Sequence, residues 1–446
     1  MPIPRRVALA ALVSWILAPA ASAATLALVG GTLIDGFGGP PLADSVILVE
    51  DQRIRAIGQV GQLAVPQDAE VVSTEGMSVF PGLWDMHVHL MIDGHADYEH
   101  WDKTYMGRFR SEIMPASAKQ LLLAGVTSAR DLGGPLEDSL AVREALRSGR
   151  IDGPTLYVSG PFIQKKPYPG TEAFRWGVDG PADARAKVQK LCDAGVDVIK
   201  LIDQDQMTRE EAQAVVDTAH ACGRIVVAHS HRPQEILRGL EVGVDDFEHT
   251  GLAGAPEYPE AVMAALHART AQMALGPLWW TPTIEGLWNY EYVRDHHEHL
   301  DDPSWQVGLA PDTIADIKAS IAHPDRLPYF QINPLRKPTL ARKFAQLKGS
   351  GAVLLIGTDS GIPMKFHSQS TWNELDVWVR ELGVKPMEAL RAATYWPAVA
   401  SKADKDYGTL TVGKYADIVA VRGDVLRYIN LLQRPDLVVK HGRRVR

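Results

Sequence analysis

The feature that most constrains the fold of this chain is a series of eight apolar, strand-like runs separated by segments with helical spacing. The runs are SVFPGLWDMHVH, GVTSARD, TLYVSG, VDVIKLI, IVVAHSH, DDFEH, a weaker one through QMALGPLWWTPT, and AVLLIGTD. Strands that alternate with helices are typical of parallel β/α units, and eight such units close into a barrel. We therefore expect an α/β fold with a (β/α)8 TIM-like barrel over residues 78–405.

Short strand-like segments also lie at both ends of the chain. They are TLALVGGTLIDG and SVILVEDQRIRAIG near the start, and GTLTVGKYADIVAVRG and LVVKHGRRVR near the end. Each end is too small to bury a core alone, so the two are best satisfied by packing on each other. This predicts one small, discontinuous β-sandwich domain made of residues 24–77 and 406–446. A long insertion, roughly residues 285–337, follows the seventh run, and we expect it to be a lid or a subunit contact.

The first residues have the pattern of an export signal. Two arginines precede an apolar run over residues 7–17, and the tripeptide ASA at residues 21–23 fits the small-x-small cleavage pattern. The run is short for a membrane span, and the alternative is a buried N-terminal helix. We expect residues 1–23 to be a signal peptide and the mature protein to be secreted or periplasmic.

Charge and cysteine content narrow the choice of partners. The net charge of -8 over 446 residues argues against nucleic acid or an anionic membrane, because counterion-driven binding needs a basic face. A small soluble molecule is the favoured partner. The two cysteines, Cys192 and Cys222, lie in stretches that read as helices facing a core, so we expect two buried free thiols, although an oxidising compartment would allow them to pair.

Polar side chains stand at the ends of the predicted strands, where barrel enzymes place reactive groups. His87 and His89 are two apart on one strand, so both side chains point the same way and can share one metal ion. His229 and His249 end two successive strands, and neutral imidazole suits zinc, although a single such histidine is more often a core residue. Asp359 ends the eighth run, where it could bind an ion and accept a proton from water, or simply cap a helix.

Lys200 closes the apolar stretch VDVIK. A charged ammonium that faces a barrel interior is unfavourable without a partner. One interpretation is an ion pair with Asp197 or Asp203. The other is a neutral lysine that has reacted with carbon dioxide, which would give a carbamate whose two oxygens bridge two cations.

The stretches FPGLWDMHVHL, VIK, AHSH, FEHTG and GTDSG together resemble the amidohydrolase superfamily, in its binuclear metal subtype and its imidazolonepropionase-like or Xaa-Pro dipeptidase-like branch. GVTSARDLGG, TWNELDVWV, PMEALRAAT and GTLTVGKYADIVA support the resemblance, which covers essentially the whole mature chain. It implies that His87, His89 and Asp359 hold one ion, and that His229 and His249 hold the other.

The resemblance further implies two divalent metal ions, with zinc expected, bridged by N6-carboxylated Lys200 and a hydroxide, while Asp359 shuttles the proton. The implied reaction is hydrolysis of an amide bond in a dipeptide or an N-acyl amino acid, in a carboxypeptidase-like or dipeptidase-like activity that includes ochratoxin-type amides. A lactonase, a phosphotriesterase or a cyclic amidase would use the same site. A non-enzymatic metal-binding protein is disfavoured because all six ligand types are present. Similar proteins are often homo-oligomers, and we expect the same here.

Four residues are candidates for contact with the substrate. His231 lies two residues past the histidine of AHS, where similar proteins contact the substrate carboxylate; the alternative is a solvated loop histidine. Lys165 and Tyr168 follow the third run in GPFIQKKPYPGT, where relatives often carry a Gly- and His-containing segment, so this departure leaves the anionic contact open. His367, in MKFHSQSTW, could also line the pocket.

Overall fold

The computed structural model describes residues 25–446 apart from 252–254, 285, 287, 289–290, 292–294 and 323–326. The predicted signal peptide, residues 1–23, and parts of the predicted insertion lie outside the described residues. None of the helices that the structure describes combines the length and the hydropathy that crossing a bilayer requires.

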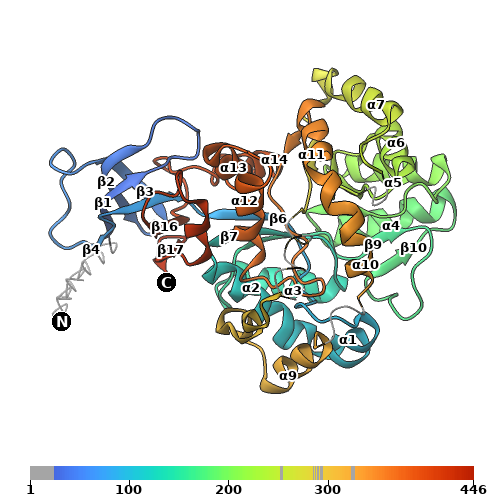
Figure 1. Ribbon diagram of the computed structural model, residues 1–446, viewed down its shortest axis with the longest axis horizontal. Coiled ribbons are helices and arrows are strands. Elements are labelled where there is room, and N and C mark those ends of the chain that lie inside the picture. The colour runs from blue at the N-terminus through green and yellow to red at the C-terminus, as the bar shows by residue number, and fades with distance from the viewer. Residues whose placement is uncertain are drawn as a thin grey trace, which may run out of the picture.

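Strands from both ends of the chain form one sheet. They are β1 (Thr25–Leu33), β2 (Leu42–Glu50), β3 (Arg53–Gln59), β4 (Glu70–Ser73), β5 (Met77–Pro81), β16 (Ile418–Arg422), β17 (Leu437–Lys440) and β18 (Arg443–Arg444). Their order is β18-β17-β16-β5-β1-β2-β3, with β4 paired to β1. The two chain ends are joined where β5 runs antiparallel to β16, with Phe80 opposite Val419. Figure 1 shows this sheet at one end of the molecule.

The remaining strands form two sheets in which neighbouring strands run parallel. The first sheet holds β6 (Leu83–Val88), β7 (Val126–Asp131) and β8 (Thr155–Val158). The second holds β9 (Phe162–Gln164), β10 (Arg175–Gly177), β11 (Val198–Leu201), β12 (Ile225–His229), β13 (Asp246–Glu248), β14 (Trp279–Thr281) and β15 (Val353–Leu354), in the order β10-β9-β11-β12-β13-β14-β15. Each of the eight predicted runs contains at least one strand. The sequence did not predict β9 and β10, which are three-residue strands that lie outside the eight apolar runs.

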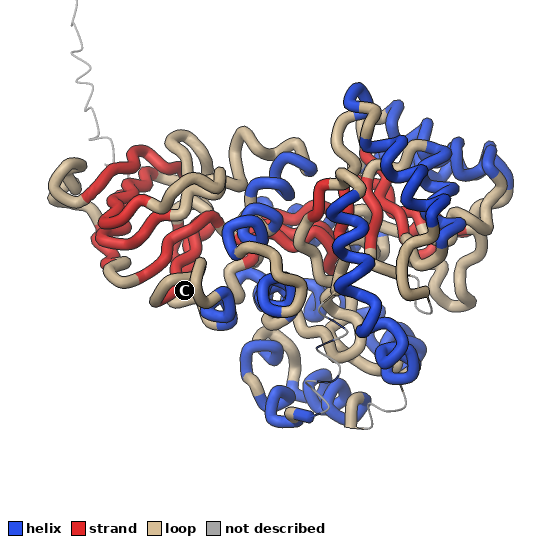
Figure 2. The backbone as a smooth tube through the Cα atoms, turned by 45° about the horizontal axis from the view of Figure 1, so that its top comes forward, coloured by secondary structure: helices blue, strands red, loops and turns tan. Residues whose placement is uncertain are grey.

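Helices occupy the segments between these strands. They are α1 (Tyr98–Tyr105), α2 (Met114–Leu123), α3 (Leu136–Arg147), α4 (Gly180–Ala194), α5 (Arg209–Ala221), α6 (Pro233–Val242), α7 (Glu260–Thr270), α9 (Pro311–Ser320), α10 (Pro328–Arg336), α11 (Leu340–Gly349), α12 (Ser370–Arg380), α13 (Pro386–Ala392) and α14 (Tyr395–Ala400). Local signals fix several boundaries: a capping box of Thr208 and Glu211 opens α5, and Gly195 in the left-handed region ends α4. In Figure 2 helices lie around the parallel strands. The predicted α/β class is confirmed.

Backbone hydrogen bonds join the two parallel sheets at two places. Met86 N, on β6, donates to Ile356 O just beyond β15 at 3.0 Å, and Asp197 N, just before β11, donates to Val158 O on β8 at 2.8 Å. The first bond brings the end of β15 beside β6, although these strands are more than 250 residues apart in the sequence. The carboxyl ends of β6 and β15 therefore lie next to each other.

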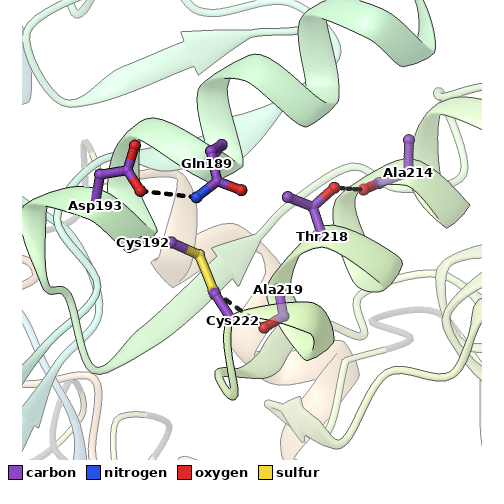
Figure 3. The surroundings of a disulfide bond; sticks show 7 residues. All are labelled: Gln189, Cys192, Asp193, Ala214, Thr218, Ala219 and Cys222. Carbon is purple, nitrogen blue, oxygen red and sulfur yellow. Dashed lines mark hydrogen bonds between the residues drawn. A yellow bond between two sulfur atoms is a disulfide. The ribbon is translucent and has the colours of Figure 1, made fainter.

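The cysteines form a disulfide, so the prediction of two buried free thiols was wrong. Cys192 lies near the end of α4 and Cys222 directly follows α5, with their Cα atoms 6.3 Å apart (Figure 3). Both residues are half-buried. The two helices are neighbours whose carboxyl ends meet, and the sequence pattern of each helix alone could not reveal that contact.

Candidate metal centre

The first group of candidate ligands joins the end of β6 to the segment that follows β15. His89 Nε2 lies 3.1 Å and His87 Nε2 3.3 Å from Oδ1 of Asp359. His87 is fully buried, His89 is 7% exposed, and the Asp359 side chain is 16% exposed. One potential ligand atom from each residue lies within 4.8 Å of the others, which is the spacing that a shared cation needs.

The second group consists of His229, His231 and His249, whose potential ligand atoms also lie within 4.8 Å of one another. His229 ends β12 and His249 directly follows β13. The rings of His231 and His249 are stacked, with centroids 4.5 Å apart and planes 9° apart. Nδ1 of His249 lies 2.8 Å from the hydroxyl of Thr283, which leaves Nε2 as the nitrogen free to face a cation. His231, which the sequence predicted as a substrate contact, lies in this histidine group.

Lys200 lies on β11 and is fully buried. Its Nζ has no hydrogen-bond partner among the residues that the structure describes. Asp197 and Asp203, the alternative partners that the sequence suggested, instead pair with Arg143 at 2.6 Å and with Arg232 at 2.8 Å. Burial lowers the pKa of Lys200 to about 8, although Glu248 and Asp359 oppose this shift. An ammonium without a partner is unfavourable here, whereas a neutral amine is reactive toward carbon dioxide.

Electrostatic effects connect Lys200 to both ligand groups. The charge of Lys200 adds to burial in lowering the pKa of His87 in the first group and the pKa values of His229 and His249 in the second. Burial is the largest cause in each case and holds all three pKa values well below the usual histidine value. The three imidazoles are therefore neutral, which is the form that binds a metal ion.

The carboxylate of Asp359 is held in its ionised form. Burial alone would raise its pKa, but the nearby His87 and His89 more than offset this, and the pKa lies well below the usual aspartate range. Asp359 has a φ of 62° and His249 a φ of 73°, a region that side chains other than glycine seldom adopt. Such strain is typical of functional sites, where the surrounding structure fixes the conformation.

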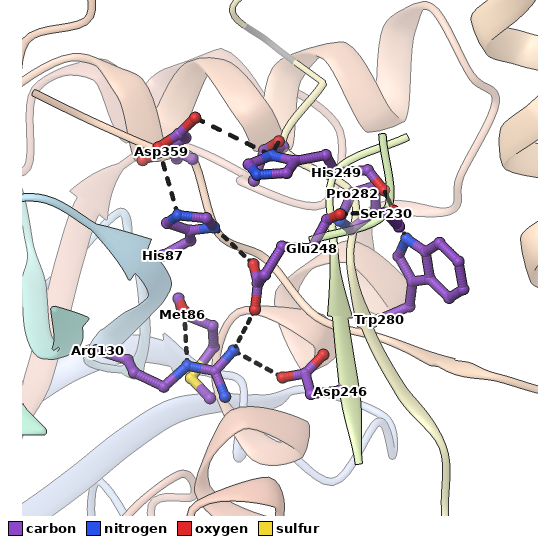
Figure 4. Close-up of polar contacts among 12 residues, drawn as sticks. Met86, His87, Arg130, Ser230, Asp246, Glu248, His249, Trp280, Pro282 and Asp359 are labelled. Atoms are coloured by element: carbon purple, nitrogen blue, oxygen red, sulfur yellow. Dashed lines mark hydrogen bonds and ion pairs between the residues drawn. The ribbon is translucent and has the colours of Figure 1, made fainter. Parts of the chain in front are cut away.

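A buried carboxylate that sequence reasoning missed orients His87. Glu248 Oε2 lies 2.6 Å from His87 Nδ1, and both side chains are fully buried. Arg130 Nη2 donates to Glu248 Oε1 at 2.8 Å and to Asp246 Oδ2 at 2.6 Å, while its Nε donates to the Met86 carbonyl at 2.8 Å (Figure 4). A carboxylate on the far nitrogen of a ligating histidine fixes the tautomer and the ring orientation.

A second buried carboxylate braces the strand that carries the histidine pair. Asp85 Oδ1 accepts hydrogen bonds from the backbone nitrogens of His87 at 3.1 Å and Thr358 at 3.0 Å. Its Oδ2 accepts from the hydroxyls of Thr358 at 2.7 Å and Thr371 at 2.8 Å. These bonds tie β6 to the segment that carries Asp359, so they help to set the geometry of the first ligand group.

A cavity of about 370 Å³ opens above these residues. Members of both ligand groups line it together with an aromatic set, namely Tyr98, Phe162, Tyr168 and Phe174. Of the four predicted substrate contacts, Tyr168 and His231 line this cavity. Lys165 is not among the lining residues and pairs with Glu211 at 2.6 Å. His367 is fully buried between the Ser360 hydroxyl and the Ile92 carbonyl, which indicates a structural role.

The donor set fits two divalent cations. Each group supplies three oxygen or nitrogen ligands of the type that zinc prefers. The buried Nζ of Lys200 has no described hydrogen-bond partner, and a carboxylated side chain at this position would offer two further oxygen ligands. The metal-binding character that the sequence predicted is supported by this arrangement.

Comparisons with known proteins agree with this geometry. A sequence model described as "Amidohydrolase family" matches residues 78–445. The ochratoxinase of Aspergillus niger is 24% identical over 456 residues, covering 92% of this chain and 83% of that protein. The imidazolonepropionase of Geobacillus sp. (strain WCH70) is 24% identical over 423 residues, covering 89% of each chain. A solved structure of a Xaa-Pro dipeptidase with bound methionine in the active site shares the fold, with a TM-score of 0.71 and 22% identity over 94% of this chain and 99% of that chain.

Proposed function

This chain belongs to the amidohydrolase family, and on that premise we propose that it is a binuclear, zinc-dependent hydrolase of dipeptides or N-acyl amino acids. The proposal includes a closed (β/α)8 barrel, which the hydrogen bonds between β6 and β15 and between β8 and β11 support. The proposal is supported by the names of similar proteins, which are an ochratoxinase, an imidazolonepropionase and a Xaa-Pro dipeptidase. The family itself supports hydrolysis of an amide bond that depends on divalent metal ions.

The observation that carries the proposal is the position of Lys200 beside two groups of metal ligands. Its Nζ is buried without a described hydrogen-bond partner, and its strand β11 pairs with β12, the strand that ends at His229. We propose that His87, His89 and Asp359 hold one ion, that His229 and His249 hold the other, and that N6-carboxylated Lys200 bridges them. Carboxylation joins the neutral amine to carbon dioxide with loss of one proton, and the ions then stabilise the carbamate.

The bound ions would polarise the scissile carbonyl and lower the pKa of the attacking water. Asp359 is placed to handle the proton, because its carboxylate is ionised and lies at the edge of the cavity. It would accept the proton of the attacking water and then donate it to the leaving amine. Glu248 would hold the His87 ring in the tautomer whose Nε2 faces the cation.

The cavity supports a substrate of modest size with an apolar group. Its volume of about 370 Å³ lies near the lower end of ordinary ligand pockets. Phe162, Tyr168 and Phe174 present aromatic surface on its wall, which favours an apolar acyl group or side chain. Both a dipeptide and an N-acyl amino acid satisfy these requirements.

We also propose that the protein is exported. Residues 1–23 have the pattern of a signal peptide. The disulfide between Cys192 and Cys222 supports export, because such bonds persist in oxidising compartments. N-terminal sequencing of the mature protein from a cell fractionation would test export; a cytoplasmic protein that still begins at Met1 would contradict it.

The proposed activity can be tested on one preparation. The chelated protein is assayed against libraries of dipeptides and N-acyl amino acids, before and after addition of zinc, with the released amine as readout. We expect hydrolysis only after zinc is added. Lactones and phosphotriesters serve as competing substrates, and turnover of these with no amide hydrolysis would contradict the proposal. Full amide hydrolysis in the chelated, metal-free protein would contradict it as well.

A further inference from the structure

We propose that Arg175 binds the free carboxylate of the substrate's leaving amino acid, so that the enzyme acts on the amide bond next to a free α-carboxylate. This inference rests on the proposed function and deepens it, because it assigns the anionic contact that the sequence left open. It places the substrate in the chemical class of carboxypeptidase substrates with an aromatic or large apolar final residue.

Arg175 shares a cavity with the candidate metal ligands. It lies on β10, the short strand that pairs with β9 at the edge of the second parallel sheet. The cavity that it lines is also lined by His89, His229 and Asp359, from both ligand groups. A substrate bound in this one cavity can therefore present its carbonyl to the ligand groups and its carboxylate to the guanidinium.

The guanidinium of Arg175 retains hydrogen-bonding capacity. Its Nη1 donates to the Gln164 side-chain oxygen at 3.0 Å, whereas its Nε is buried without a hydrogen-bond partner. Among the residues that the structure describes, no carboxylate lies within 4.0 Å of it. Asp102, on the same cavity wall, makes no ion pair with Arg175, although the charges of the two residues interact. A half-buried guanidinium with a buried, unsatisfied Nε favours binding of an anion.

Aromatic rings surround this guanidinium. Its central carbon lies 4.8 Å from the ring centroids of Phe162 and Tyr168 and 5.8 Å from that of Phe174. Stacking on aromatic faces holds a guanidinium in place without neutralising it, so its planar donors remain available for a carboxylate. The same rings form an apolar surface beside the proposed carboxylate site, which suits the side chain of an aromatic amino acid.

The two nearby lysines, Lys165 and Lys166, are not placed to bind the substrate carboxylate. Lys165 is paired with Glu211 and does not line the cavity. Lys166 is exposed and is also absent from the cavity wall. Among the described residues that line this cavity, Arg175 is the one with a positively charged lysine or arginine side chain. The carboxylate contact therefore falls to the arginine on β10 and not to the lysines that the sequence drew attention to.

The test compares benzyloxycarbonyl-glycyl-phenylalanine with its C-terminal carboxamide, using the zinc-loaded full chain. We expect the wild type to prefer the free acid by about 10- to 100-fold in kcat/KM, the range of a charge-assisted hydrogen bond. Arg175→Gln should lose that preference, mainly through a higher KM for the acid, with the rate on the carboxamide unchanged. Arg175→Lys should restore part of it. Lys166→Gln removes a charge from the same segment outside the cavity and should behave as the wild type.

A binding measurement separates this inference from the proposed function. Calorimetry compares L-phenylalanine with L-phenylalaninamide on the wild type and on Arg175→Gln. Selective binding of the acid that is lost in the variant, without turnover of either peptide, would overturn only the proposed function. Three results would overturn the role of Arg175. They are equal binding of the acid and the amide, no binding of either, and an equal loss of activity on both peptides in Arg175→Gln.

Discussion

Replacement of Glu248 by glutamine is expected to weaken metal binding without unfolding the protein. Glu248 Oε2 lies 2.6 Å from His87 Nδ1, and both side chains are fully buried. The glutamine keeps the size of the side chain and an oxygen that accepts a hydrogen bond, so the change removes mainly the negative charge behind the imidazole. That charge makes the ring a better ligand.

The expected magnitude follows from this contact and its surroundings. Loss of a carboxylate that supports a ligating histidine lowers metal affinity by about 10- to 100-fold, or about 1.4 to 2.7 kcal/mol. Breaking a buried ion pair typically lowers the free energy of unfolding by roughly 3 to 5 kcal/mol. The loss in this variant should be smaller, because Arg130 keeps Asp246 as a partner at 2.6 Å. The variant should therefore remain folded while its affinity for zinc falls.

The assay is competition with a chromophoric zinc chelator, accompanied by urea unfolding. Glu211→Gln is the matched control, because Glu211 is also buried and pairs with a cation, Lys165, but does not contact the candidate metal ligands. We expect the control to lose stability and to keep its zinc affinity. Equal zinc affinities for Glu248→Gln and the wild type would refute the role assigned to Glu248.

Three further predictions concern the centre and a buried acid nearby. Lys200→Ala should lose bound metal and activity together, with partial rescue by small carboxylates, and a normal metal content would rule out the carbamate. Asp359→Asn should retain at least one ion while kcat falls by about 100-fold or more, and near-native turnover would argue against its role in proton transfer. Burial raises the pKa of Asp93 to about 8 from a reference value of 3.8, so the folded state binds this proton more tightly than the unfolded state does. As the pH rises between those two values, the free energy of unfolding falls by at most about 1.4 kcal/mol per pH unit. Asp93→Asn should therefore raise the free energy of unfolding more at pH 8 than at pH 5 in urea titrations; an equal effect at both would contradict this explanation.

Much of the candidate centre was predictable because it follows from strand geometry. Side chains two apart on a strand share a face, which placed His87 and His89 together. The carboxyl ends of parallel strands lie at one edge, which brought His229, His249 and Asp359 into the same region. The resemblance to the amidohydrolase superfamily, based on these same stretches, is confirmed by the match over residues 78–445.

The supporting residues depend on contacts that strand periodicity does not encode. Glu248 lies 161 residues from His87 and 118 from Arg130, so only the folded chain shows that the three interact. A signal was present, since GVTSARD and DDFEH each place charged residues inside a predicted core strand, where each charge needs a buried partner. Arg175 gave no such signal, because β10 has three residues and no apolar period. The disulfide likewise depends on two helices being neighbours.

The most direct test of the central claim is native mass spectrometry of the zinc-loaded protein and of Lys200→Ala. The two-ion centre predicts two zinc ions per chain in the wild type, together with one added mass of carbon dioxide that is lost on acidification. Lys200→Ala should lack both the carbon dioxide and the full metal content. An active wild-type protein that carries a single ion, or two ions without the added carbon dioxide, would contradict the carbamate-bridged centre.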